Sequence, residues 1–239
     1  MCKISTKICI LTAALLVLCS ASASQTMATT IDEQLCDAAA DIALATGDYP
    51  MAIELHSRYL RSKRNDALAH YHLGFAYGME GRVAEEIDEY HKAMILGLNK
   101  WDLFLNLGLA YCDRHEFENA TAALETAVLL GPQHAETHFN LAVVYERENR
   151  LDQALHEIIA SLVLASEDPD ALNTDAIICA KMGKLEFARN IWTQLVQTAP
   201  DYAPARTNLA VLNQSCGGSC GPYAHSQSGE LLSQFGSDE

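Results

Sequence analysis

The chain has 239 residues, 49% of them hydrophobic and 20% charged, and its formal net charge at pH 7 is −15. A chain this acidic repels the phosphates of nucleic acids and of anionic lipids, so neither is expected as a partner. Beyond the N-terminal region, no apolar stretch is long enough to predict a membrane span.

Residues 1–23 have the composition of a cleavable export signal. Two lysines precede an apolar run (8–18), and small residues then lead to a cleavage site expected after Ala23. Such a run spans ~16 Å as a helix, against ~30 Å for the core of a bilayer. We therefore expect an exported protein, periplasmic or secreted, with a short linker at 24–32. An uncleaved anchor and a lipoprotein acylated at Cys19 stay open as alternatives.

A 34-residue period dominates the chain from about residue 33 to residue 212. It is carried by turn residues (Gly47, Gly81, His115, Asn149, Gly183) and by small residues in two rows (Ala40, Gly74, Gly108, Ala142, Ala176, Ala210; and Ala52, Ala120, Ala154, Ala188, with Glu86 in the same register). On either side of each turn residue, apolar residues recur every three or four positions, which indicates two helices per period. A fixed period of this size predicts a stack of two-helix units instead of one closed core.

The expected units are 33–66, 67–100, 101–134, 135–168 and 169–202, followed by a closing helix at 203–212. The third unit shows the full pattern, with Leu107-Gly108-x-x-Tyr111, then Phe117, Ala120, Leu124 and Ala127, and finally Pro132. This pattern resembles the tetratricopeptide repeat family. The resemblance implies an all-α fold, a right-handed superhelical solenoid in which first helices line a concave groove and second helices face outward.

In that family the groove binds peptides or partner proteins, so the resemblance also implies candidate binding residues. The sixth position of successive units forms what we call the position-6 row: His72, Asn106, Asn140, Thr174 and Asn208. Beside it lies an apolar strip formed by Tyr71, Phe75, Leu105, Leu109, Phe139, Val143 and Ile177. Asparagine offers a donor and an acceptor, so the row suits the main chain of an extended segment. The alternative is that each asparagine bonds its neighbouring helix.

The charges at the groove positions indicate what kind of segment is expected. Acidic residues occupy many of them (Asp37, Asp41, Asp102, Asp113, Glu136, Glu146 and Asp170). The positions at which related grooves grip a C-terminal carboxylate carry no lysine or arginine. A neutral or basic extended protein segment is therefore favoured as the partner.

The cysteines and histidines give no recognisable metal or catalytic motif. Cys36, Cys112 and Cys179 are expected as free, buried side chains in the first helices of three different units. His70 and His72 lie two apart on one helix and point to different sides, and the other histidines are scattered over separate units or straddle a turn. No metal site, no cofactor and no enzymatic activity are predicted.

The last segment, 213–239, is rich in serine and glycine and is expected to be disordered. Its Cys216 and Cys220 can form a small disulfide in an oxidising compartment. Three functions are compatible with the sequence: a scaffold that binds a partner in the groove, an envelope or secretion subunit that assembles through its outer helices (Arg150, His156 and Arg189), and a redox protein acting through the tail cysteines. The first is the main hypothesis, and the second is its alternative.

Overall fold

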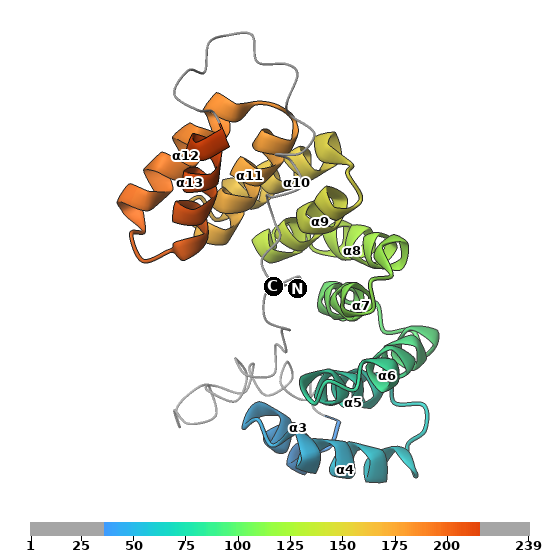
Figure 1. The fold of residues 1–239 in the computed structure, drawn as a ribbon. Coiled ribbons are helices and arrows are strands. Elements are labelled where there is room, and N and C mark those ends of the chain that lie inside the picture. The colour runs from blue at the N-terminus through green and yellow to red at the C-terminus, as the bar shows by residue number, and fades with distance from the viewer. Residues whose placement is uncertain (1–35, 216–239) are drawn as a thin grey trace, which may run out of the picture. The chain divides into compact units, whose positions relative to one another are not determined.

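The computed structural model describes residues 36–215, and all regular structure within them is helical (Figure 1). These residues fall into two compact units, 36–130 and 131–215. None of the described helices has both the length and the apolar character needed to cross a membrane. The predicted signal peptide, the linker and the cysteine pair of the tail lie outside the described residues.

The helices alternate between the first and the second member of a hairpin. The first members are α3 (Ala38–Ala45), α5 (Ala67–Met79), α7 (Trp101–Asp113), α9 (Ala135–Arg147), α11 (Pro169–Lys181) and α13 (Ala203–Ser215). The second members are α4 (Tyr49–Leu60), α6 (Val83–Ile95), α8 (Phe117–Leu130), α10 (Leu151–Leu164) and α12 (Leu185–Thr198). From α5 onward, each first helix begins where the repeat period predicts. The closing helix runs on to Ser215, past the predicted end at Leu212.

The turn inside each hairpin explains why the period includes residues other than glycine. Gly47, Gly81 and Gly183 have φ values of 79°, 72° and 78°. His115 and Asn149 adopt the same left-handed conformation, with φ of 59° and 58°. This geometry lets the amide after the turn residue bond back to the helix, which satisfies carbonyls that the helix end would otherwise leave open.

Packing within each compact unit follows the order of the helices. There each helix contacts the next, and first helices also contact the next first helix, as in the pairs α3 with α5, α5 with α7, and α9 with α11. Inside each compact unit the hairpins therefore bury their apolar faces against one another, which is the packing of a repeat stack. The predicted all-α solenoid of helix hairpins is confirmed.

Two glycines show how closely the helices of a hairpin approach. A Cβ added at Gly108 would lie 2.6 Å from Cγ of Leu124, so only glycine fits there in this hairpin. In the preceding hairpin Glu86 replaces the usual small residue and is fully buried. A Cβ added at Gly78 would lie 2.4 Å from the Glu86 carboxylate, so this glycine leaves room for the larger side chain.

Candidate functional site

In residues 36–130 the position-6 row joins neighbouring first helices. Asn106 of α7 is fully buried, and its Nδ2 donates to the Tyr71 hydroxyl of α5 over 3.2 Å. That hydroxyl donates in turn to Oδ2 of Asp102 over 3.2 Å. The other row member, His72 of α5, places Nδ1 2.8 Å from Oδ1 of Asp41 in α3. Here both row members therefore bond the preceding first helix, which is the alternative that the sequence left open.

In residues 131–215 Asn208 bonds the preceding first helix, whereas Asn140 bonds only its own helix. Nδ2 of Asn208 donates to Oδ1 of Asn173 over 3.0 Å, and the indole Nε1 of Trp192 donates to the same oxygen over 2.9 Å. Asn140 donates to the carbonyl of Glu136 in its own helix over 2.9 Å. Its Oδ1 has no hydrogen-bond partner among the described residues. The side-chain oxygen of Asn140 is thus an acceptor of the row without a donor among the described residues.

Most of the predicted apolar strip belongs to the interior. Five of its members are buried: Tyr71, Phe75, Leu105, Leu109 and Phe139. The other two, Val143 and Ile177, are half-buried, and so is Thr174 of the position-6 row. The members of the position-6 row and of the apolar strip that keep some exposure therefore lie on α9, α11 and α13.

The acidic groove positions are also largely occupied by internal contacts. Asp41, Asp102 and Glu146 are buried, and Glu146 pairs with Nζ of Lys181. Asp113 and Asp170 are exposed, although Oδ1 of Asp170 accepts from the Tyr202 hydroxyl over 2.6 Å. Less negative charge is exposed at these positions than the sequence indicates.

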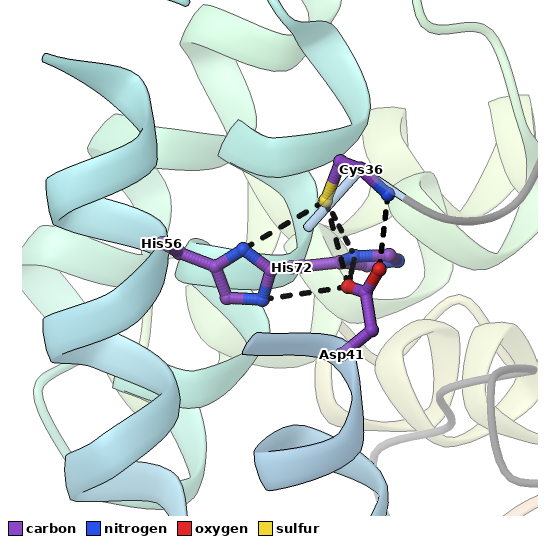
Figure 2. Close-up of side chains that lie close together, drawn as sticks. All are labelled: Cys36, Asp41, His56 and His72. Atoms are coloured by element: carbon purple, nitrogen blue, oxygen red, sulfur yellow. Dashed lines mark hydrogen bonds and ion pairs between the residues drawn. The ribbon is translucent and has the colours of Figure 1, made fainter. Parts of the chain in front are cut away.

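Four polar side chains meet where the first hairpin packs on the second, and we call them the Cys/His cluster: Cys36, Asp41, His56 and His72 (Figure 2). Cys36 precedes α3, and the others come from α3, α4 and α5. Sγ of Cys36 lies 3.4 Å from Nδ1 of His72, 3.7 Å from Nδ1 of His56 and 3.5 Å from Oδ1 of Asp41. One ligand atom from each residue lies within 4.8 Å of all the others. These are the atom types that bind transition metals.

Burial sets the ionisation of this cluster. Burial by itself would raise the pKa of Asp41, but the hydrogen bond from His72 and the charges of both histidines outweigh it and hold that pKa below its usual value. Burial, helped by the charge of His72, lowers the pKa of His56 to about 4. Burial and the neighbouring Asp41 raise the pKa of the Cys36 thiol. A neutral thiol is a poor nucleophile, so the cluster does not resemble an activated cysteine site.

The sequence pattern does not predict this cluster, because its members have separate expected roles. The pattern places Asp41 and His72 in the groove and Cys36 inside a first helix. The last prediction was wrong, because α3 begins at Ala38 and Cys36 is only half-buried before it. The matching prediction for Cys112 and Cys179, which are buried and not part of a disulfide, is confirmed.

A comparison of equivalent positions in the repeat units does indicate the cluster. At the ninth position, where the first unit has Asp41, later units have Phe75, Leu109, Val143 and Ile177. At the 24th position, where the first unit has His56, they have Tyr90, Leu124, Ile158 and Trp192, all fully buried. The first unit alone therefore places ionisable side chains at two apolar positions of the repeat.

Two other histidines have a shared structural role. Nδ1 of His70 lies 2.5 Å from Oε2 of Glu89, and its Nε2 lies 3.0 Å from a backbone carbonyl. Nδ1 of His138 lies 2.6 Å from Oε2 of Glu157, and its Nε2 also lies 3.0 Å from a backbone carbonyl. His70 and His138 occupy the same position of two repeats, and each places one ring nitrogen beside a carboxylate of the second helix. These histidines therefore link the two helices of their hairpins.

The second helices carry an exposed apolar position that also follows the period. Ile95, Leu129 and Val163 occupy the same position of three successive units and are 85%, 82% and 79% exposed. We call them the outer apolar row. They lie at or near the C-terminal ends of α6, α8 and α10. Ile95 and Leu129 belong to residues 36–130 and Val163 to residues 131–215, so each compact unit exposes part of the row as a candidate interaction surface.

Comparison with known proteins agrees with this architecture. The family model described as tetratricopeptide repeat matches residues 38–95 and 105–171. No curated protein sequence gave a match.

Several solved structures share the fold. The structure of YrrB, a TPR protein with an unusual peptide-binding site, is 23% identical, with 70% of this chain and 87% of that chain covered and a TM-score of 0.66. A MamA structure is 20% identical, covering 71% and 98% of the two chains with a TM-score of 0.65. MamA from Desulfovibrio magneticus RS-1 is 16% identical, covering 69% and 93% with a TM-score of 0.64. At such identities the likeness concerns the fold alone.

Proposed function

Because the chain belongs to the tetratricopeptide repeat family, we propose that it is an exported scaffold that binds a partner protein on the surface of its stacked hairpins. Repeat stacks expose long surfaces to which several hairpins contribute, and such surfaces suit partners that make many weak contacts. The same fold serves many binding functions, so the residues on each surface decide which one holds the partner.

The first candidate surface is the side of residues 131–215 on which the first helices α9, α11 and α13 lie, which would bind an extended segment. The observation that favours it is the buried Oδ1 of Asn140, which has no donor among the described residues. Val143 on the same helix and Thr174 and Ile177 on α11 are half-buried. Asn140 is 1% exposed, so its neighbours have to shift before an extended segment can supply a backbone N–H to this acceptor and an apolar side chain to Val143 and Ile177. The peptide-binding site described for YrrB, which has a similar fold, is consistent with this use.

The second candidate surface is the part of the outer apolar row within one compact unit, above all Ile95 and Leu129 of residues 36–130, through which the chain would act as an assembly subunit. Ile95, Leu129 and Val163 are all largely exposed. Exposed side chains of this size at a recurring position suit the apolar face of a folded partner better than an extended segment. This surface therefore represents a different mode of binding.

One experiment separates the two surfaces. The tagged chain is crosslinked in the exporting cells and purified, as the wild type and as two variants. The groove variant carries Asn140→Ala and Thr174→Ala, and the outer variant carries Ile95→Ser, Leu129→Ser and Val163→Ser. A groove partner is expected to lose about 1 kcal/mol, or roughly five-fold in affinity, with Asn140→Ala alone. An outer partner is expected to be lost only from the outer variant.

Both variants change side chains whose loss should leave the fold intact, which far-ultraviolet circular dichroism can verify. Full recovery of the same crosslinked partner with both variants would contradict both surfaces. The absence of any partner specific to the folded wild type would contradict the scaffold itself.

Export is proposed from the lysine-flanked apolar run and the small residues that follow it. Protein recovered from the periplasm or the medium should begin at Ser24, as mass spectrometry of the intact chain or its N-terminal peptide can establish. An arginine in the middle of the apolar run, Leu15→Arg, should leave the precursor inside the cell. Exported protein that retains residues 1–23, or carries a lipid on Cys19, would overturn the cleavage proposed after Ala23.

A further inference from the structure

The Cys/His cluster has a use that the scaffold function does not require. We propose that Cys36, Asp41, His56 and His72 bind one divalent transition-metal ion, with Zn²⁺ as the ion to test, and that this ion fastens the first hairpin to the second. The site is independent of where a partner binds.

The spacing of the donor atoms is close to what a tetrahedral ion needs. Bond lengths of about 2.3 Å to sulfur and roughly 2.0–2.2 Å to nitrogen and oxygen place the ligand atoms of such a site roughly 3.3–3.6 Å apart. Sγ of Cys36 lies 3.4 Å and 3.7 Å from Nδ1 of His72 and of His56. Nε2 of His56 lies 3.6 Å from Oδ1 of Asp41. Either ring nitrogen of His56 is thus within reach of the same centre.

Some distances have to change on binding, because the four ligand atoms are within 4.8 Å of one another and not all at tetrahedral spacing. Nδ1 of His72 and Oδ1 of Asp41 are 2.8 Å apart, which is the length of a hydrogen bond. An ion inserted between them would separate them by roughly half an ångström. Asp41 would keep its other contact, since its Oδ2 accepts from the backbone N–H of Cys36 over 2.9 Å. That bond holds the carboxylate in place, as outer contacts of metal ligands do.

An unsatisfied buried atom points independently to a ligand. His56 is fully buried, and its Nε2 has no hydrogen-bond partner in the part of the chain that the structure describes. Buried polar atoms are nearly always paired with protein, water or an ion. Because the equivalent residue of every later full unit is apolar, packing alone does not explain a histidine at this position.

The donor set selects the class of ion. One thiolate, two imidazoles and one carboxylate suit zinc and its neighbours, whereas calcium and magnesium prefer oxygen ligands only. Four protein ligands complete a tetrahedral shell, which is typical of structural sites. Cys36 is half-buried and so gives the ion a way in, and its thiol proton passes to solvent when the ion binds.

The location implies what the ion does. The ligands join α3, α4 and α5 and the residue before α3, and α3 itself has only 8 residues. Helices that short are held by their tertiary contacts. Binding to the folded form alone would stabilise this hairpin, which within the described residues has a neighbouring hairpin on one side.

The test uses the whole chain, with the cysteines outside residues 36–215 changed to serine so that thiolate signals come from the repeats. Metal-free protein is titrated with Co²⁺, which gives thiolate charge-transfer absorption and intense visible bands when its site is tetrahedral. One equivalent of Co²⁺ should produce both signals, and one equivalent of Zn²⁺ should remove them. Zn²⁺ should also raise the Tm.

The decisive variant, which we call the restored variant, carries residues that the repeat uses elsewhere. Its substitutions Asp41→Leu, His56→Leu and His72→Asn copy Leu109, Leu124 and Asn106, so it is expected to fold. It should bind Zn²⁺ at least ~100-fold more weakly and lose its Tm response. His91→Gln, at an exposed histidine outside the cluster, is the matched control and should bind as the wild type does. Absence of stoichiometric binding by the wild type, or equal binding by the restored variant, would overturn the proposal.

Discussion

Replacing Trp192 by alanine is expected to destabilise residues 131–215 by about 4 kcal/mol, because truncating a buried tryptophan removes a large apolar surface and leaves a cavity. The side chain is fully buried in a cluster that includes Ala176 of α11, Leu195 of α12 and Leu212 of α13. Its indole N–H also donates to Asn173 over 2.9 Å. One side chain therefore joins three consecutive helices.

Urea unfolding followed by circular dichroism measures the loss, and amide hydrogen exchange shows where it falls. Exchange should accelerate in α11–α13 and stay unchanged in α5–α8, because contacts in a repeat stack run mainly between neighbours. Trp192→Phe is the control. It keeps most of the volume and leaves Asn173 its bond from Asn208, so it should cost much less. A loss below ~1 kcal/mol for Trp192→Ala would show that α12 is not the centre of this core.

The architecture could be predicted from the sequence because it depends on local features that recur. A left-handed turn residue followed by apolar residues at helical spacing defines each hairpin without reference to the rest of the chain. His115 and Asn149 replace glycine at that turn and still adopt positive φ. The period identified them where residue type alone would have left them ambiguous.

The contacts of the polar side chains were harder to predict from the sequence. Asn106 and Asn208 bond residues 35 positions earlier, and His72 lies beside Asp41 from 31 positions earlier. A repeat pattern states which residues lie at equivalent positions, but not whether a polar side chain faces a partner or the preceding hairpin. The prediction that these residues bind a peptide stays a prediction, with Asn140 its best-supported member.

The Cys/His cluster was missed for a related reason. Metal motifs are recognised by short spacings along one helix or loop, whereas these ligands come from three helices and the residue before the first of them. Departures from the repeat were the useful signal. Asp41 and His56 occupy positions that every later full unit fills with an apolar residue.

Asp41→Ala, without metal, is expected to destabilise the first two hairpins by about 3 kcal/mol at pH 7, because leaving buried donors unpaired costs about 1–3 kcal/mol each. The change removes the acceptor of three donors, since Asp41 accepts from the Cys36 N–H over 2.9 Å and from the Cys36 thiol over 3.5 Å, and its Oδ1 lies 2.8 Å from Nδ1 of His72. Urea unfolding in the presence of a chelator gives the value without any contribution from bound ions.

The pH dependence has a definite sign. Burial favours the neutral form of Asp41, but the hydrogen bond from His72 and the nearby charges outweigh it, so the folded pKa lies below the usual 3.8. A depressed carboxyl pKa contributes stability that is complete above the unfolded value and is lost as the pH falls through the folded one. The difference between wild type and Asp41→Ala should therefore be constant near neutrality and shrink only below about pH 4.

The restored variant should behave in the opposite way under the same metal-free conditions. The variant replaces Asp41 and His56 by leucine and His72 by the asparagine that the repeat uses at this position. Replacing buried polar partners together is often neutral or stabilising by about 1–4 kcal/mol, whereas removing one partner is costly. Three substitutions should thus harm the apo protein less than one. That order would mean that the first hairpin carries its polar core at a cost in stability, which an ion could offset. If the restored variant were as unstable as Asp41→Ala, the polar contacts themselves would be what holds α3 in place.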